Sequence, residues 1–247
     1  MSKSLYLIIG MVLFLSCTSE KEISSQYIVD KAIEVAGGEQ FLNSEIAFTF
    51  RDYQYTSERG AFGYELTRSF IKDSLQVNDR IRNGKFTRFI DQERQSLLDS
   101  VALKYYNSVN SVHYFAYLPQ GLNDKAVQKE LLGEVVLKGE PYYKVRVTFA
   151  QEGGGNDYED VFIYWFHKQK FTMDYLAYEF HVDGGGMRFR EAVNPRFISG
   201  IRFADYKNYK PRKAIKIELL DEAYASGQLE WLSDIRLEEV TVQITPD

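Results

Sequence analysis

The chain has 247 residues, 15% of them aromatic and only five of them proline, and its formal net charge is −5. This length fits one mainly β domain, and the aromatic content is typical of a folded sheet rather than a disordered chain. Because 35 acidic residues face 30 basic ones, no basic surface dominates, which argues against nucleic acid as a partner.

Residues 1–16 are predicted to form a secretory signal peptide. Lys3 precedes the apolar run Leu5 to Leu15, which is too short to span a membrane. The only cysteine follows directly, in Phe14-Leu15-Ser16-Cys17, which resembles a bacterial lipobox. That resemblance implies cleavage before Cys17 and lipidation of its sulfur and its new amine, and two or more acyl chains give stable membrane anchoring. The alternative is an ordinary secretory signal with an incidental cysteine.

Residues 17–25 would then be a lipid-anchored tether to the membrane. Loss of Lys3 with the signal peptide changes the net charge from −5 to −6. Thr18, rather than Asp, follows the cysteine, which by resemblance to the lipoprotein sorting rule favours the outer membrane. The periplasmic face and the cell surface both remain open.

Residues 26–247 are expected to form a single domain that begins with a helix. Ser25 is its expected N-cap, and Gly37-Gly38 ends it. The apolar period then changes to two from Ile46 through Tyr55. Further strands are expected at Tyr64–Ile71, Leu75–Ile81 and Lys85–Ile90. Asn83-Gly84 favours a type I′ hairpin turn, so this half is predicted to be a four-strand antiparallel meander.

Ser96 to Leu118 interrupts the strands with apolar residues at helical spacing, and Pro119 closes the segment. A polar and aromatic stripe on a second face of this helix consists of Tyr106, Asn110, His113 and Tyr117. The stripe either packs beneath the sheet or faces a ligand.

Pro141 to Tyr206 is predicted to be a run of consecutive antiparallel strands. Tyr143, Val145, Val147 and Phe149 alternate with polar residues, as in a half-buried strand. A change in apolar parity predicts a β-bulge near Leu176. Beyond this run we expect a basic loop at Lys207–Ala214, a short helix at Leu219–Gly227 and a final strand at Leu232–Ile244.

Two triple-glycine turns, Gly153–Gly155 and Gly184–Gly186, interrupt this run and are expected on the same rim of the sheet. His181 lies close to the second turn, and His181, Arg188 and Arg190 are candidate ligand-binding residues beside it. The candidate ligands for a Ca²⁺ site on this rim are Glu152, Asp157, Glu159, Asp160 and Asp183. Alternatively the carboxylates form a solvated surface, or Arg188 and Arg190 neutralise them in a purely structural cluster.

No catalytic motif stands out. The sequence contains no nucleophile elbow, phosphate-binding loop or His-Glu-x-x-His motif, and its histidines are too scattered for a local zinc site. An enzyme is therefore less favoured than a binding protein, and no cofactor other than Ca²⁺ is expected.

Several motifs together resemble the DUF6503 family of Bacteroidetes lipoproteins over nearly the whole mature chain. They include Asp30-Lys-Ala-Ile33, Tyr106-Asn-Ser-Val-Asn-Ser-Val112, Lys138-Gly-Glu-Pro-Tyr-Tyr-Lys144, Asp183-Gly-Gly-Gly186 and Gly200-Ile-Arg-Phe-Ala-Asp-Tyr206. More loosely, a helix ending in Gly-Gly before a long meander is similar to LolA and LolB, lipoprotein carriers that hold acyl chains in an incomplete β-barrel. The implied fold is α+β, mainly β: a single curved antiparallel sheet with the N-terminal helix and the inserted helical segment on its concave side.

The leading hypothesis is an outer-membrane lipoprotein that binds a lipid or other amphiphile in this concavity. The candidate wall residues are Phe48, Phe50, Phe70, Phe149, Phe162, Trp165, Tyr175 and Phe180. The alternatives are a surface module that presents the acidic rim to a cation, glycan or protein, and a hydrolase with paired carboxylates such as Glu159 and Asp183.

Overall fold

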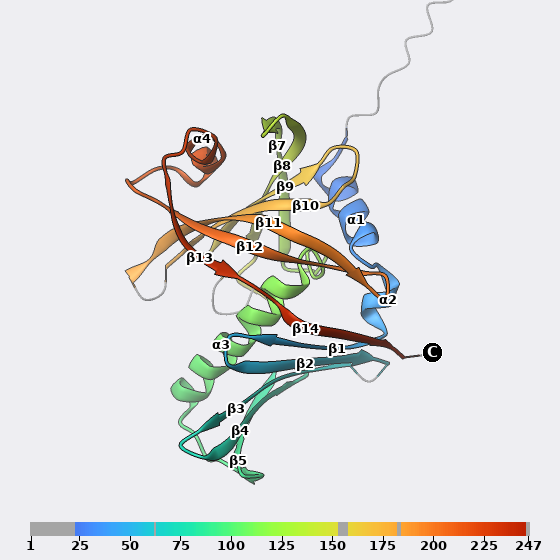
Figure 1. The fold of residues 1–247 in the computed structure, drawn as a ribbon, viewed down its shortest axis with the longest axis vertical. Coiled ribbons are helices and arrows are strands. Elements are labelled where there is room, and N and C mark those ends of the chain that lie inside the picture. The colour runs from blue at the N-terminus through green and yellow to red at the C-terminus, as the bar shows by residue number, and fades with distance from the viewer. Residues whose placement is uncertain (1–22, 62, 153–157, 182–183, 246–247) are drawn as a thin grey trace, which may run out of the picture.

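The structure, a computed structural model, describes residues 23–61, 63–152, 158–181 and 184–245. Two antiparallel sheets of seven strands each enclose a long helix (Figure 1). Sheet A has the order β14-β1-β2-β3-β4-β5-β6, and sheet B the order β13-β12-β11-β10-β9-β8-β7. The expected mainly β, α+β architecture is confirmed, with the curved antiparallel surface divided into two sheets.

The N-terminal helices are α1 (Ser25–Val35) and α2 (Glu39–Leu42). The N-cap of α1 is Ser24, not Ser25: Ser24 has extended backbone angles, and its Oγ accepts a hydrogen bond from the Tyr27 amide at 3.1 Å. Ile28 and Val29 of α1 are fully buried against sheet B.

Sheet A contains more strands than expected. Its elements are β1 (Ser44–Phe50), β2 (Tyr53–Gly60), β3 (Gly63–Lys72), β4 (Leu75–Arg82), β5 (Lys85–Ile90), β6 (Glu93–Arg94) and β14 (Glu238–Ile244). The alternation from Ile46 to Tyr55 is two strands, because Arg51 adopts a positive φ of 55° and turns the chain. Asn83 and Gly84 both have positive φ, as a type I′ turn requires.

Sheet B contains the predicted meander and one strand that was not predicted. Its elements are β7 (Val127–Leu137), β8 (Glu140–Phe149), β9 (Val161–His167), β10 (Met173–Phe180), β11 (Gly186–Ile198), β12 (Ile201–Pro211) and β13 (Leu229–Ile235). β8 to β12 pair consecutively and antiparallel, as expected. The irregularity in β10 lies between Met173 and Tyr175, slightly earlier than the predicted bulge near Leu176.

The two sheets are joined where β13 leads into β14, a stretch predicted as one strand. β13 pairs with β12 in sheet B, whereas β14 pairs with β1 in sheet A. Asp205 fixes the crossing: its carboxylate accepts from the Leu237 amide at 3.1 Å and pairs with Arg196 at 3.1 Å. The chain thereby passes from one sheet to the other without a separate connecting loop.

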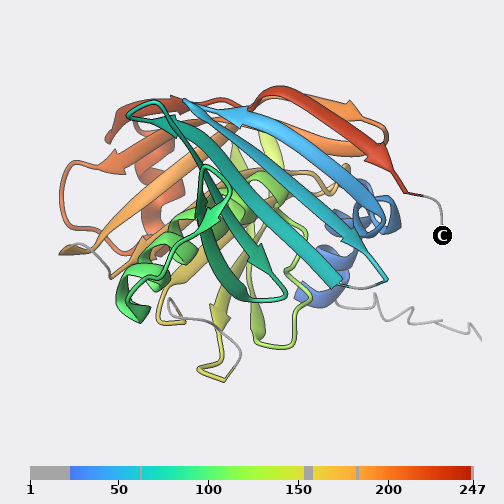
Figure 2. The same cartoon turned by 90° about the horizontal axis from the view of Figure 1, so that it is seen from below.

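Helix α3 (Asp99–Tyr117) lies between the sheets and contacts β3, β4, β5 and β12 (Figures 1 and 2). We call the sheet face toward α3 the inner face. The opposite, outer face of sheet B is covered by the short helices η2 (Ile217–Leu219) and α4 (Leu220–Ala225). Sheet B is therefore buried on both faces, and only its inner face meets α3.

Candidate ligand-binding site

The polar and aromatic stripe predicted on α3 points toward sheet A. The His113 Nε2 atom lies 2.9 Å from the Thr67 carbonyl oxygen, so this nitrogen carries the proton, since a carbonyl can only accept. The Tyr117 hydroxyl donates to Ser57 Oγ at 2.8 Å. Tyr106 packs on a small buried cluster of sheet A. The stripe thus fastens α3 to sheet A.

Burial controls the protonation of this stripe. It lowers the pKa of His113 to about 3, and the nearby Arg59 guanidinium acts in the same direction. Burial also raises the pKa of Tyr117 to about 12. Asn110 is only half-buried. His113 and Tyr117 are consequently neutral packing groups at neutral pH.

The opposite side of α3 meets sheet B through aromatic rings. Phe115 packs against Tyr178 with ring centroids 5.1 Å apart, and against Phe162 at 6.3 Å. The Tyr114 hydroxyl is 2.9 Å from that of Tyr164 on β9. We call this contact between α3 and the inner face of sheet B the aromatic interface.

Arg190 on β11 lies buried beside the aromatic interface. Its side chain is stacked over Phe115, with 4.0 Å from Cζ to the ring centroid, and it donates to the Tyr178 hydroxyl at 2.9 Å. Arg190 is only 8% exposed, and its Nε atom is buried without a hydrogen-bond partner. Within the described part of the chain no carboxylate pairs with this guanidinium. Burial lowers the pKa of Arg190, and the neighbouring Arg188 adds to that effect.

Asn208 on β12 stands directly opposite Arg190 in the sheet. Its Oδ1 atom is also buried without a hydrogen-bond partner, while its Nδ2 atom is 3.4 Å from Ser233 Oγ. Cross-strand partners point to the same face. An unsatisfied donor and an unsatisfied acceptor therefore lie side by side on the inner face of sheet B.

Trp165 and Tyr175 were predicted as concave-wall residues, and this prediction was wrong. Both are buried on the outer face of sheet B beneath α4. The Trp165 indole donates to Asp221 at 3.2 Å, and Lys144 pairs with the same carboxylate at 2.8 Å. Strand alternation predicts which residues share a face, but not that a distant helix covers the second face.

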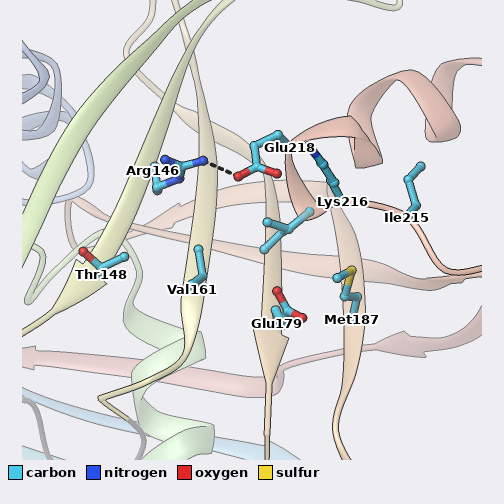
Figure 3. A pocket seen from close by; sticks show the side chains of 9 residues that line it. Arg146, Thr148, Val161, Glu179, Met187, Ile215, Lys216 and Glu218 are labelled. Atoms are coloured by element: carbon cyan, nitrogen blue, oxygen red, sulfur yellow. Dashed lines mark hydrogen bonds and ion pairs between the residues drawn. The ribbon is translucent and has the colours of Figure 1, made fainter.

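One surface hollow lies on that outer face, beside η2 (Figure 3). It has a volume of about 480 Å³. Arg146 reaches across it to Glu218 and also pairs with Glu130 at 2.9 Å. Two carboxylates therefore neutralise the Arg146 guanidinium, whereas no carboxylate among the described residues pairs with Arg190.

A second hollow, of about 410 Å³, lies on the outer face of sheet A and is lined by Arg80, Arg82, Lys85 and Arg94 among others. Arg80 pairs with Glu65 at 3.2 Å. This open, exposed surface contains none of the candidate ligand-binding or metal-binding residues predicted from the sequence.

The acidic rim is only partly described. Asp157 and Asp183 lie outside the described residues, while Glu152 and Glu159 are exposed and Asp160 is half-buried. His181 is exposed. Among the described residues, no group of three or more His, Cys, Asp or Glu side chains is arranged to hold a metal ion. The predicted Ca²⁺ site, the neighbouring glycine turns and the neutralisation of the rim by Arg188 and Arg190 stay predictions.

Sequence reasoning proposed Arg190 as a ligand residue but missed Asn208. Asn208 falls in the segment taken as a basic loop, which is in fact the end of β12. Phe115 was recognised only as part of an apolar helix stripe. For Asn208, the available signal was that the strand continues beyond Lys207. For Phe115, it was an aromatic residue on the helix face opposite His113. Neither signal identifies the residue that the side chain contacts in the fold.

Taken together, these features define an α+β protein of two open antiparallel sheets around a central helix, with a buried cation at the helix–sheet contact. The family described as "Family of unknown function (DUF6503)" matches residues 3–236. The chain belongs to this family, which confirms the resemblance seen in the sequence.

The chain is similar to several solved structures. A DUF1329 family protein from Desulfovibrio piger matches with a TM-score of 0.53 and 11% identity, over 91% of this chain and 95% of that chain. A LolA superfamily protein from Nitrosomonas europaea matches with a TM-score of 0.47 and 14% identity, over 91% and 94%. The Mycobacterium tuberculosis lipoprotein LppX matches with a TM-score of 0.29 and 11% identity, over 64% and 90%. No curated protein sequence matches the chain.

Among the described residues, no helix is both long and apolar enough to cross a membrane.

Proposed function

We propose that this protein is a membrane-anchored, non-enzymatic lipoprotein that binds a lipid or other amphiphile between α3 and the inner face of sheet B. Cys17 supplies the anchor in this proposal, with the domain held at the outer membrane. The observation that carries the proposal is the asymmetric attachment of α3 to the two sheets.

The polar contacts of the α3 stripe go to sheet A. Arg68 adds to them by donating to Ser108 Oγ at 2.8 Å. By contrast, α3 meets sheet B through aromatic rings, apolar packing on Ile201 and Phe203 of β12, the Tyr114–Tyr164 hydroxyl pair and the stacked Arg190. Separation of α3 from sheet B would therefore break few polar bonds.

An acyl chain suits such a contact because its binding needs apolar surface and no fixed polar geometry. Each buried methylene contributes about 0.8 kcal/mol, so about ten methylenes can offset the aromatic contacts that the chain displaces. The names of the LolA superfamily protein and of the lipoprotein LppX are in line with this proposal. The same fold hosts many functions, so the contact itself carries the argument.

The test uses the chain from Thr18 onward, which contains every described helix and strand, purified without detergent and stripped of lipid by organic extraction. Uptake of a fluorescent fatty acid is followed by titration, and the stoichiometry by native mass spectrometry. We expect one bound amphiphile per chain.

Phe115→Ala should weaken uptake by about tenfold, because it removes the ring on which the chain would lie. Val109→Ala is the matched control, since Val109 is a fully buried residue on the side of the same helix that packs on sheet A. The proposal fails if the stripped protein takes up no amphiphile, or if both variants weaken uptake equally.

A further inference from the structure

Arg190 is an unusual residue to bury. A buried charge costs several kcal/mol unless an opposite charge and hydrogen bonds compensate it. Two other buried arginines follow that rule: Arg68 pairs with Asp79 at 2.6 Å, and Arg202 pairs with Asp174 at 3.1 Å. Among the described residues, the Arg190 guanidinium has one hydrogen-bond acceptor, the Tyr178 hydroxyl, and stacks on the rings of Phe115 and Tyr178.

The surroundings of Arg190 contain hydrogen-bonding groups that the fold does not use. Its Nε donor is unused, and the amide of Asn208 stands opposite. The two ends of an amide are nearly equal in shape, so the Asn208 amide can be rotated by half a turn without a change in packing. Oδ1 then accepts from Ser233 Oγ, and Nδ2 lies beside Arg190 as a second donor. Arg188, two residues earlier on the same face of β11, adds a second positive charge.

We propose that Arg190 and Asn208 select amphiphiles whose headgroup carries an acidic oxygen, either a carboxylate or a phosphate. This inference rests on the proposed function, because Arg190 lies at the aromatic interface where the acyl chain would enter. The headgroup oxygens would accept from Arg190 and Asn208, while the chain would lie along Phe115. An anionic headgroup would thus supply the counter-charge that the fold itself does not.

Four probes separate the chemistry of the headgroup from that of the chain. Dodecanoate and dodecyl phosphate carry the two acidic headgroups, dodecanol carries the same chain without charge, and inorganic phosphate carries the charge without a chain. Binding to the stripped chain from Thr18 onward is measured by calorimetry and native mass spectrometry.

Three substitutions complete the test. Arg190→Met removes the charge but keeps an unbranched side chain. Asn208→Asp places a carboxylate opposite Arg190, which should raise the melting temperature while it occupies the anion position. Arg59→Met is the matched control, because Arg59 on β2 also has a buried unpartnered nitrogen but stacks on Phe41 and Tyr117 at sheet A.

We expect the two anionic amphiphiles to bind about 10- to 100-fold more tightly than dodecanol, the range for charge-assisted hydrogen bonds. Arg190→Met and Asn208→Asp should abolish that difference and leave dodecanol binding in place, whereas Arg59→Met should preserve it. The carboxylate and the phosphate probe together tell which acidic headgroup is preferred.

Other outcomes would overturn the inference in distinguishable ways. Equal binding of dodecanol and dodecanoate by the unsubstituted chain would refute anion selection while leaving amphiphile binding intact. Binding of inorganic phosphate as tight as that of dodecyl phosphate would show a small-anion site and refute the amphiphile class. Binding of none of the probes would refute the proposed function itself.

Discussion

The neutral state of His113 makes the stability of this fold depend on pH. His113 is 1% exposed, and burial lowers its pKa in the folded protein to about 3, against an ordinary value of 6.5. The folded pKa lies below the unfolded one, so the unfolded chain binds the additional proton between these two values. The contribution to stability is therefore complete above a pH of about 6.5 and is lost progressively as the pH falls toward 3.

The size of the effect follows from proton linkage. With these two pKa values, His113 alone lowers the free energy of unfolding by about 2 kcal/mol at pH 5 and about 3 kcal/mol at pH 4, relative to pH 8. This is a large part of the stability of a typical domain. Because carboxylates also titrate in this range, the histidine must be isolated by comparison with a variant.

His113→Gln is that variant, since glutamine can still donate to the Thr67 carbonyl and does not titrate. Urea unfolding at pH 8, 5 and 4, monitored by near-ultraviolet circular dichroism, should give a shallower pH dependence for His113→Gln than for the natural chain. His181→Gln, at an exposed histidine, serves as control. Parallel stability curves for the natural chain and His113→Gln would refute the burial of a neutral imidazole.

Three further outcomes are expected. Asp79→Ala should lower the free energy of unfolding by about 3–5 kcal/mol in urea titrations. The guanidinium groups of Arg68 and Arg88 each lie 2.6 Å from the Asp79 carboxylate and would lose their counter-charge. A loss below about 1 kcal/mol would contradict this expectation. Tyr114→Phe should cost only about 1 kcal/mol in the same assay and leave the fold intact, since the lost hydrogen bond joins two hydroxyls; a larger loss would mean that this pair holds α3 to sheet B. Cys17→Ser should remove the acyl mass from the mature protein and release it from the membrane fraction, and unchanged membrane association would argue against lipidation.

Local patterns predicted the elements of this fold well where one face of an element is apolar. The alternation of Tyr143, Val145 and Val147 correctly predicted β8 and its inner face. The expectation that the strand is only half-buried was wrong, because Tyr142 and Lys144 on its other face are also buried. The helical spacing of the inserted segment predicted α3. By contrast, β7 was not predicted. Its more buried and more exposed residues alternate only weakly along the strand, and an irregularity between Leu131 and Gly133 interrupts its register.

Errors at element boundaries have a similar local origin. Two adjacent serines, Ser24 and Ser25, stand at the start of α1, and the local sequence does not distinguish which of them is the N-cap, since either hydroxyl can accept from an end amide. The break between β1 and β2 occurs at Arg51, a residue type with no particular preference for positive φ. Such a turn is imposed by the pairing of the flanking strands.

By itself, the sequence determined the family, the mainly antiparallel β class, the inserted helix and the faces on which its aromatic and polar residues lie. These properties depend on the periodicity of neighbouring residues and on a specific set of motifs. Only the tertiary structure decided which sheet each face of α3 meets, that α4 covers Trp165, and that Arg190 is buried opposite Asn208 without a carboxylate. The reason is physical: burial and charge compensation depend on contacts between segments far apart in the chain, and no local spacing encodes their pairing.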